Sequence, residues 1–433
     1  MSGRMFVLAD ADSFYASCER VFHPELARRP LVVLSNNDGC VVSRSREAKL
    51  LGISNGTPWF KIRGQAEHDG VVARSSNYEL YASLSRRMMR LMAATLSGQE
   101  IYSIDECFLR GFQDPQRTRI ACTRMRETVL QGIGIPLTIA TAPTRTLAKI
   151  VSHYIKHQGG GIGDWDLLKH QEPDVLDRID VSEVWGVGRR LTRRLQGMSI
   201  TTAGDLARAD PSRIRHLFSV LLQRTVLELQ GIPSIELDDF DAIDGTRKQQ
   251  LMCSRMFGHP ITGLPDLSAA VSTYAQQASI RLRRQGSLAG MVTVFIATSP
   301  FNQDYQSRSG SIILTDPADD PLTIARAAAG TLPRMIDPHA RYVRAGVMLG
   351  ALTDAASYTT FDGMDARRDN GLGTILDQAN RKFGLQSVGI GWAGMKGKGR
   401  ARQEIGATWN MKRQHLSNRG TTRWDELAIA KAI

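Results

Sequence analysis

The order of strand-like and helix-like segments is the feature that most constrains the fold of this chain. Short apolar runs typical of buried strands lie at residues 5–10, 31–34, 40–43, 101–109 and 137–141. Apolar residues at steps of three and four, the spacing of an amphipathic helix, lie near residues 77–96, 117–130 and 144–157. Strands that alternate with helices predict a mixed α/β (α+β) domain, a sheet covered by helices.

The pattern changes after residue 157. Residues 173–232 are helical in pattern, and the Asp-rich stretch 238–244 is typical of a linker. A second α/β unit is predicted over about 247–352, with a helix near 267–284 and strands at 291–297 and 343–349. A chain of 433 residues is expected to form two to four domains.

Composition narrows the class of protein. The net charge of +12 favours a polyanionic partner such as nucleic acid, and residues 377–433 hold 11 Lys and Arg against 4 Asp and Glu. The five cysteines are odd in number and form no CxxC pair, so we expect reduced thiols rather than disulfides or a zinc site. Asp10 and Asp12 interrupt the first apolar run, so this run indicates a strand rather than a signal peptide. We therefore expect the protein to be cytoplasmic.

Three carboxylates are candidates for a metal site. Asp10 ends the first predicted strand, and Asp105 and Glu106 follow Ser103 in a later one. Carboxylates brought together need cations to stay ionised, and oxygen ligands suit magnesium. An Asp-Glu pair more often marks a solvated turn, but the apolar residues Ile104 and Phe108 beside it indicate a buried hairpin.

The residues around these carboxylates resemble those of a known enzyme family. The run DADSFYASCE from Asp10 to Glu19 resembles the opening signature of Y-family DNA polymerases, and SIDE from Ser103 to Glu106 resembles their second metal motif. The resemblance continues in order along nearly the whole chain. It implies a right-hand fold with a palm (residues 1–11 and 76–165), small fingers (12–75), a helical thumb (166–240), a little finger (245–352) and a basic partner-binding region (353–433).

The resemblance also implies roles for the first motifs. Asp10, Asp105 and Glu106, with the backbone carbonyl of Ala11, would hold two Mg²⁺ ions for transfer of a dNMP to a primer 3′-hydroxyl. Tyr15 falls at the steric-gate position, where its ring would exclude a ribose 2′-hydroxyl. Without the resemblance, a core aromatic at a helix start would be the preferred interpretation of Tyr15.

Five further residues would bind the incoming dNTP by the same resemblance. The hydroxyl of Ser43 and the cations of Arg46, Lys49 and Lys149 would contact its phosphates, and Phe14 would pack beside it. Many relatives carry Tyr in place of Arg46 and Arg in place of Lys49, so the contact differs in detail. The alternative for these cations is a solvated helix face. The chain has no GxxxxGK[ST] stretch, so a P-loop ATPase is not supported.

Contacts with DNA are implied at two places. Gly186 and Gly188 fit a helix–hairpin–helix whose backbone N–H groups, with Arg189 and Arg190, would bind a DNA phosphate. A helix C-cap would explain the two glycines equally well. In the little finger, the resemblance implies phosphate contacts by Lys248, Arg255 and Arg283. Each of these residues could equally be ordinary surface charge.

The C-terminal region resembles that of the UmuC subfamily. The runs from Trp409 to Arg413 and from Thr421 to Leu427 carry this resemblance, which implies binding to a processed UmuD dimer and a RecA filament. Relatives often carry a Gln-Leu-x-Leu-Phe peptide for the sliding clamp. Here the run from Ser357 to Asp362 lacks its leucines, so clamp binding through it is expected to be weaker or differently placed.

Together these features predict an error-prone DNA polymerase that copies damaged template in the SOS response. Three alternatives stay open: a DNA polymerase IV-like enzyme, a non-catalytic DNA-binding accessory protein that keeps the fold, and a cyclase or ligase with a similar palm. The long C-terminal region argues against the first, the three retained carboxylates against the second, and Tyr15 and the hairpin thumb against the third.

Overall fold

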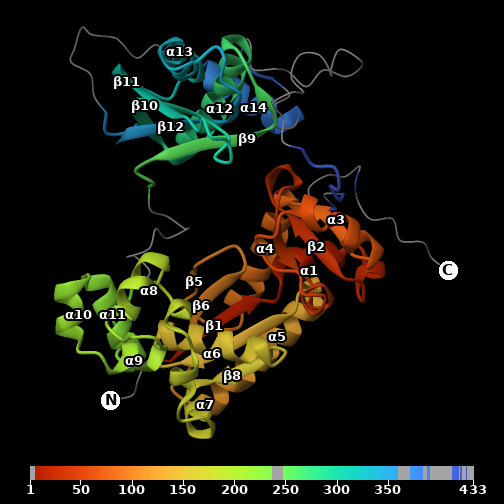
Figure 1. The fold of residues 1–433 in the computed structure, drawn as a ribbon, viewed down its shortest axis with the longest axis vertical. Helices are drawn as coiled ribbons and strands as arrows, with labels where there is room; N and C mark the ends of the chain where they lie inside the picture. Colours follow the sequence, from red (N-terminus) through yellow and green to blue (C-terminus); the bar gives the residue numbers. More distant parts are fainter. Residues whose placement is uncertain are drawn as a thin grey trace. The chain divides into compact units, whose positions relative to one another are not determined.

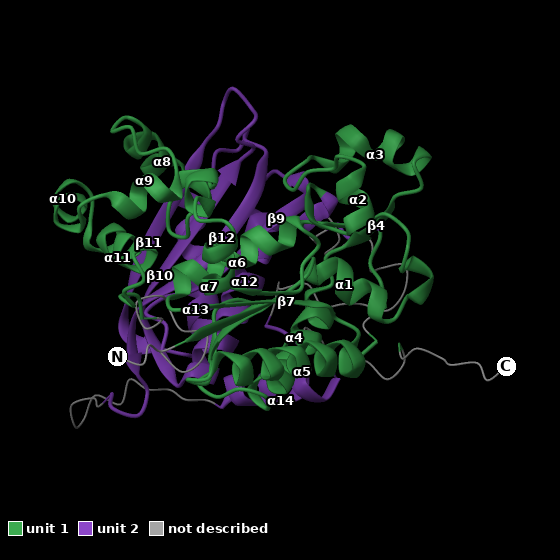
Figure 2. Cartoon of the chain, turned by 90° about the horizontal axis from the view of Figure 1, so that it is seen from below, with its two compact units in different colours: residues 1–35, 39–246, 415–433 green, residues 36–38, 247–414 purple. Residues whose placement is uncertain are grey.

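The computed structural model describes residues 5–236, 247–358, 371–383, 388–390, 412–418, 420–421 and 426. The chain divides into two compact units, coloured separately in Figure 2. Unit 1 comprises residues 1–35, 39–246 and 415–433, and unit 2 comprises residues 36–38 and 247–414. Within the described residues, no helix is both long and apolar enough to cross a membrane.

A five-stranded sheet forms the centre of unit 1 (Figure 1). Its order is β5 (Glu100–Ile101), β6 (Glu106–Arg110), β1 (Phe6–Ala11), β7 (Leu137–Ala142) and β8 (Ile162–Asp164). β1 is antiparallel to both of its neighbours. Successive side chains of a strand point to opposite faces. Val7 and Ala9 therefore pack with helices on one face, and Leu8 packs with α6 on the other.

The three helices on this sheet, which the sequence predicts, begin after residues whose side chains cap them. They are α4 (Tyr78–Ala93), α5 (Pro115–Ile133) and α6 (Arg145–His157). The side chains of Asn77, Asp114 and Thr144 accept backbone N–H groups in the first turn of each. α5 ends at Gly134, whose φ of 73° is the left-handed conformation typical of a helix C-terminus.

A smaller sheet carries the segment between β1 and α4. Its strands, in the order β3 (Val41–Arg44), β2 (Leu31–Leu34) and β4 (Val72–Ser75), are flanked by α1 (Phe14–Val21), η1 (Pro24–Leu26), α2 (Arg46–Leu50) and α3 (Trp59–His68). All four residues of β2 are buried, because the two faces of the strand belong to different cores. Between β2 and β3 the positive φ angles fall at Asn37 and Asp38, whereas Gly39 has a φ of −78°.

Helical elements lie between residues 165 and 229, where the sequence predicts a helical pattern over 173–232. The elements are α7 (Trp165–Gln171), η3 (Val175–Arg178), η4 (Val181–Glu183), α8 (Arg189–Gln196), α9 (Ala203–Arg208), α10 (Pro211–Leu217) and α11 (Val220–Leu229). Their apolar side chains share a core with α6. The predicted linker at residues 238–244 lies outside the described residues.

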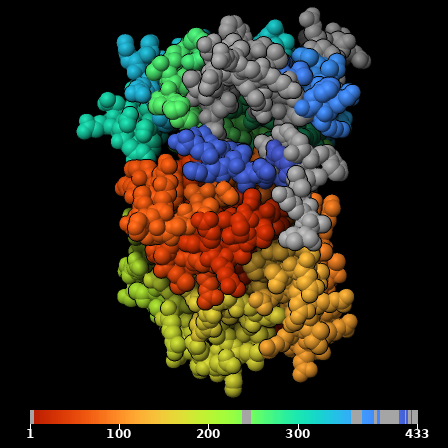
Figure 3. All heavy atoms as spheres, turned by 90° about the vertical axis from the view of Figure 1, so that its right-hand side faces the viewer, coloured from red at the N-terminus to blue at the C-terminus, as the bar shows by residue number. Residues whose placement is uncertain are grey.

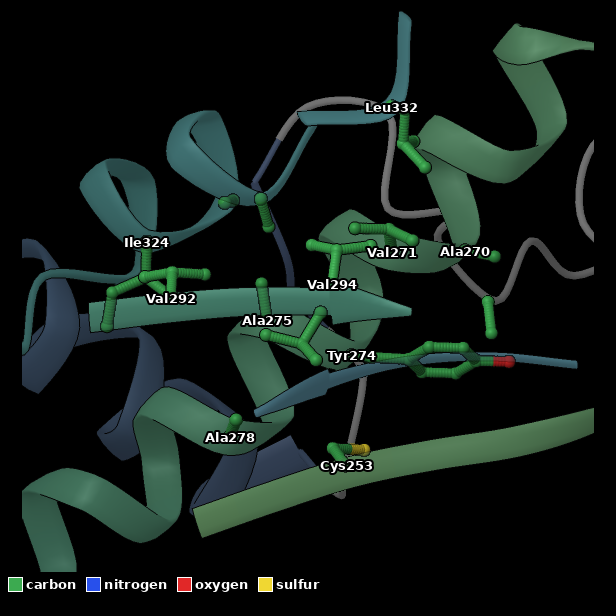
Figure 4. Packing of buried hydrophobic residues seen from close by; sticks show 14 of the residues in the cluster. Cys253, Ala270, Val271, Tyr274, Ala275, Ala278, Val292, Val294, Ile324 and Leu332 are labelled. Carbon is green, nitrogen blue, oxygen red and sulfur yellow. The ribbon is translucent and has the colours of Figure 1, made fainter. Parts of the chain in front are cut away.

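Unit 2 is an antiparallel sheet packed against helices. The strand order is β11 (Ser307–Ala318), β10 (Ser287–Thr298), β12 (Tyr342–Asp354) and β9 (Leu251–Ile261), and the helical elements are η2 (Asn36–Asp38), α12 (Leu264–Gln285), α13 (Pro321–Thr331), η6 (Leu332–Arg334) and α14 (Leu372–Phe383). Figure 4 shows Val271 of α12 beside Val294 of β10, and Tyr274 of the same helix, in this core.

The sequence analysis predicts β10, β12 and α12 but not β9, β11 or α13. β9 and β11 are the two edge strands of the sheet, so each has a neighbour on one side only. β11 is largely exposed, and Ile313 within it is 82% exposed, so its residues do not show the apolar alternation of a half-buried strand.

Candidate active site

Two of the three candidate carboxylates lie directly opposite each other in the central sheet. Asp10 and Glu106 are paired residues in the antiparallel register of β1 and β6. Beside them, the backbone N–H of Ala11 donates to the carbonyl of Asp105 at 2.9 Å. Strand pairing therefore brings together acidic residues that lie about a hundred positions apart in the sequence.

Two lysines of α6 neutralise these carboxylates. Lys156 Nζ lies 2.5 Å from Asp10 Oδ2, and Lys149 Nζ lies 2.8 Å from Glu106 Oε1. The two lysines are seven residues apart, two helical turns, so they project from the same face of α6. The third carboxylate, Asp105, accepts a hydrogen bond from the hydroxyl of Ser103.

The electrostatics of Asp10 favour a nearby cation. Burial raises the pKa of Asp10 to about 6; the charges of Glu106 and Asp105 act in the same direction, and Lys156 opposes them. In the described part of the chain, no three His, Cys, Asp or Glu side chains form a group ready to hold a metal ion. The negative charge here is balanced by lysine, and the donor set of carboxylates and carbonyls fits a hard cation.

Lys149 also lies among aromatic rings. Its Nζ is 4.2 Å from the ring centroid of Tyr102 and 5.6 Å from that of Trp185. The indole N–H of Trp185 donates to the hydroxyl of Tyr102 at 2.9 Å, which fixes the two rings against each other. The cation–π contacts hold the ammonium group of Lys149 beside Glu106.

Tyr15 lies on α1 with its ring held by other tyrosines. It stacks on Tyr81 with ring centroids 4.6 Å apart and an angle of 17° between the planes. Tyr78 meets it edge-on at 5.9 Å. Burial raises the pKa of Tyr15 to about 12, so the side chain is a neutral phenol at physiological pH.

The residues expected to bind the dNTP differ in their exposure. Phe14 is 3% exposed and belongs to the core. The hydroxyl of Ser43 is buried and contacts the start of α1. Arg46 and Lys49 are exposed on α2 three residues apart, as predicted for one helix face. Partial desolvation and the charges of Arg44 and Lys156 lower the pKa of Lys49, and the charges of Asp12 and Asp10 oppose this. Lys49 therefore lies within electrostatic range of Asp10.

Gly186 and Gly188, which the sequence analysis places in a helical hairpin, lie in the turn between η4 and α8. Gly186 has a φ of 87°, a conformation that favours glycine, and Gly188 is the N-cap residue of α8. Arg189 and Arg190 follow it and are exposed. By contrast, Arg194 donates to the carbonyl of Leu217 at 2.7 Å and is used in packing.

In unit 2, one of the three predicted DNA contacts has another role. Arg283 forms two hydrogen bonds with Asp377 of α14, at 2.7 and 2.8 Å, and a third with the carbonyl of Asp319. This guanidinium fixes α14 on α12, and we withdraw it as a DNA contact. Lys248 is exposed and Arg255 is half-buried.

Most of the predicted partner-binding motifs lie outside the described residues. These are residues 359–362 of the clamp-like run, residues 409–411, and residues 422–425 and 427. Of the first C-terminal motif, only Lys412 and Arg413 are described, and of the second only Thr421 and Glu426.

Three features of the site are absent from the sequence analysis: Lys156, the Tyr81–Tyr15 stack and the ring pair around Lys149. The seven-residue spacing from Lys149 is a signal that could have identified Lys156, because it places both lysines on one face of the helix. The ring contacts had no comparable signal, since Trp185 and Tyr102 are 83 positions apart.

The chain matches models of known families over most of its length. Residues 9–153 match the impB/mucB/samB family, and residues 248–360 match the C-terminal domain of that family. Residues 370–430 match a domain of unknown function.

Similar proteins span the same length. The chain is 40% identical to Protein UmuC of Salmonella typhimurium strain LT2 and to Protein SamB of Salmonella typhimurium, over 99% of this chain and 100% of each relative. It is 26% identical to DNA polymerase IV 1 of Bacillus subtilis, over 75% of this chain and 77% of that one.

The fold agrees with these relatives. A Y-family DNA polymerase chimera of Dbh and Dpo4 has a TM-score of 0.62 at 21% identity, over 80% of this chain and 99% of that one. An insertion ternary complex of Dbh DNA polymerase has a TM-score of 0.53 at 20% identity, over 80% and 98%. The chain therefore belongs to the impB/mucB/samB family of Y-family DNA polymerases, which carry out error-prone translesion DNA synthesis in the SOS response.

Proposed function

We propose that the nucleotidyl transfer takes place at Asp10, Asp105 and Glu106, which would hold two Mg²⁺ ions together with the carbonyl of Ala11. The pairing of Asp10 with Glu106 across β1 and β6 is the observation that carries this proposal. A divalent cation is what membership of this polymerase family implies. Bound magnesium would supply activation of the primer 3′-hydroxyl and stabilisation of the leaving pyrophosphate.

The two lysines of α6 support the same site. Lys156 and Lys149 contact carboxylates here, at 2.5 and 2.8 Å. We propose that both ammonium groups turn to the triphosphate when substrate binds, since phosphate oxygens then offer them a greater negative charge. Ser43, Arg46 and Lys49 would contact the same phosphates from the fingers, and Phe14 would support the nucleotide from the core.

Tyr15 is proposed as the steric gate. Its ring is stacked on Tyr81 at 4.6 Å and cannot move away without breaking that contact. A fixed ring beneath the sugar would clash with a 2′-hydroxyl and so select deoxynucleotides. Primer-template DNA would be held by the backbone of Gly186 and Gly188 and by the charges of Arg189 and Arg190.

In unit 2, Lys248 and Arg255 would add phosphate contacts. We propose the processed UmuD dimer and a RecA filament as protein partners, and the sliding clamp as a weaker one. The support is the similarity of the C-terminal region to the UmuC subfamily. The reaction is proposed to take place in the cytoplasm, where the bacterial chromosome and dNTPs are found.

Primer extension on a template with an abasic site tests the proposal. The reaction contains dNTPs, the processed UmuD partner and a RecA filament, with magnesium titrated from zero. We expect extension by the wild type and by Glu67→Gln, a control at an exposed carboxylate of α3. We expect none by Asp105→Asn/Glu106→Gln at any magnesium concentration.

Binding of the same primer-template by the double variant must be intact for this comparison. Extension by the double variant at the wild-type rate would overturn the assignment of the site. No extension by any protein, with DNA binding intact, would favour the non-catalytic accessory protein.

A further inference from the structure

A segment near the C-terminus, His415–Asn418, packs within unit 1 against residues from the first quarter of the chain. It belongs to the stretch that matches a domain of unknown function. The N–H of Ser75 donates to the carbonyl of His415 at 3.0 Å, and the N–H of His415 donates to the hydroxyl of Ser75, also at 3.0 Å. Figure 3 shows this blue segment against the red and orange surface of residues from the first quarter of the chain.

Asn77 joins this segment to the start of α4. It is fully buried, and its Oδ1 caps the helix by accepting the N–H of Leu80. Its Nδ2 donates to the carbonyl of Ser417 (3.2 Å), to the hydroxyl of Ser417 (3.0 Å) and to the carbonyl of Asn418 (3.2 Å). The same amide that fixes the beginning of α4 therefore also fixes the C-terminal segment.

The segment also completes the surroundings of a buried carboxylate. Glu19 is 1% exposed, and its Oε1 accepts hydrogen bonds from Tyr81 (2.7 Å) and from Ser417 (3.1 Å). Arg74 Nε is 3.9 Å from the other oxygen, beyond hydrogen-bond distance. Burial raises the pKa of Glu19, and the hydrogen bonds from Tyr81 and Ser417 oppose this. A buried carboxylate depends strongly on each donor that remains to it.

These contacts lead to the proposed steric gate. Glu19 lies four residues after Tyr15 on α1, one turn along the same helix face. Tyr81, which donates to Glu19, is also the residue on which Tyr15 stacks. The contacts therefore run without a break from Ser417 through Glu19 and Tyr81 to Tyr15.

We propose that the segment His415–Asn418 fixes the Tyr81–Tyr15 stack and thereby sets discrimination between deoxyribose and ribose. We call this segment the clamp; the name does not refer to the sliding clamp. Ser417, Glu19 and Tyr81 act as positioning residues for Tyr15. The proposal rests on the proposed role of Tyr15 as the steric gate. Under this proposal, part of the domain of unknown function takes part in nucleotide selection.

Kinetics on the full-length chain with its partners tests the clamp. The readout is discrimination, the ratio of kcat/KM for dATP to kcat/KM for rATP on one primer-template. We expect Ser417→Ala to lower this ratio roughly tenfold, the effect of one lost hydrogen bond to a charged group. Ser417→Thr keeps the hydroxyl and should keep the ratio. Leu416→Ala alters a neighbouring exposed side chain and should also keep it.

A double-mutant cycle tests whether Ser417 acts through Glu19. Tyr81→Phe keeps the stacked ring but removes the other donor to that carboxylate. If both hydroxyls act on one carboxylate, the effects of Ser417→Ala and Tyr81→Phe on discrimination will not add. Additive effects, or unchanged discrimination in Ser417→Ala, would overturn the proposal.

Two further measurements separate the clamp from the gate. Tyr15→Ala should abolish most of the discrimination; if it does not, the gate assignment fails and the clamp has no role in sugar selection. If Tyr15→Ala relaxes discrimination but Ser417→Ala does not, the clamp alone fails. Hydrogen exchange should show a protected Ser75 amide in the wild type, and exchange as fast as in an unfolded chain would contradict docking.

Discussion

The ammonium group of Lys156 lies 2.5 Å from Oδ2 of Asp10, at the end of the central strand. In the proposed site, Asp10 is a ligand of a metal ion and Lys156 is a cation that contacts phosphate. Without substrate, each neutralises the other inside a partly buried site, where an unpaired charge would be costly. We expect the pair to separate when metal and dNTP bind.

Removal of the Lys156 charge should therefore weaken dNTP binding. For Lys156→Met we expect kcat/KM for a correct dNTP to fall about tenfold to a hundredfold, mainly through KM, because a charge-assisted contact is lost. Lys169→Met, at an exposed lysine of α7, serves as the control. Steady-state single-nucleotide insertion measures both, and an unchanged KM for Lys156→Met would contradict the assignment.

The ring of Tyr102 should matter more than its hydroxyl. Tyr102→Leu removes the aromatic face that lies 4.2 Å from Lys149 Nζ, and we expect KM for dNTP to rise about threefold. Tyr102→Phe keeps the face and loses the bond from Trp185, so its KM should stay closer to that of the wild type. Equal effects of the two variants in the insertion assay would show that the hydrogen bond, and not the ring, positions Lys149.

Arg189 and Arg190 should contribute to DNA affinity whatever the sequence of the DNA. Each phosphate contact adds about 0.9 to the slope of log Kd against log salt, so Arg189→Ala/Arg190→Ala should reduce the slope by about 2. The control is Arg208→Ala, because Arg208 is already paired with Asp177 at 2.7 Å and Asp205 at 3.0 Å. Fluorescence anisotropy over a salt series measures the slopes, and equal slopes for all three proteins would contradict a thumb contact.

Thiol reactivity provides a check on the fold. Cys40 is half-buried, whereas the other four cysteines are buried. Burial raises the pKa of Cys107 and Cys122 to about 12, so the reactive thiolate is scarce in them at neutral pH. We expect one thiol per chain to react quickly with a disulfide reagent at pH 7, and all five after denaturation. Two or more fast thiols in the native protein would contradict the packing of unit 1 or unit 2.

Local patterns were sufficient to predict much of unit 1. Asn77 and Thr144 are capping residues followed by apolar side chains at helical spacing, so the starts of α4 and α6 followed from chemistry within one helical turn. The acidic motifs likewise identified the neighbourhood of Asp10 and Glu106, and the register of β1 and β6 placed the two opposite each other.

What could not be predicted depends on contacts between distant residues. β11 was missed because an edge strand with an exposed face has little apolar alternation. Arg283 was assigned to DNA because a sequence does not show that Asp377, 94 positions away, would pair with it. The contact between Ser417 and Glu19 spans 398 positions and involves a small polar side chain, for which no periodic signal exists.

The position of β1 in the middle of the central sheet has a consequence for when activity can appear. Asp10 is made early in translation, but β6 and β7, which pair with β1 on its two sides, end at Arg110 and Ala142. A nascent chain or proteolytic fragment that stops before β7 leaves the strand of Asp10 unpaired on one side and lacks α6 with both lysines. In terms of the proposed site, a fragment that ends before β7 and α6 is therefore expected to be inactive in DNA synthesis.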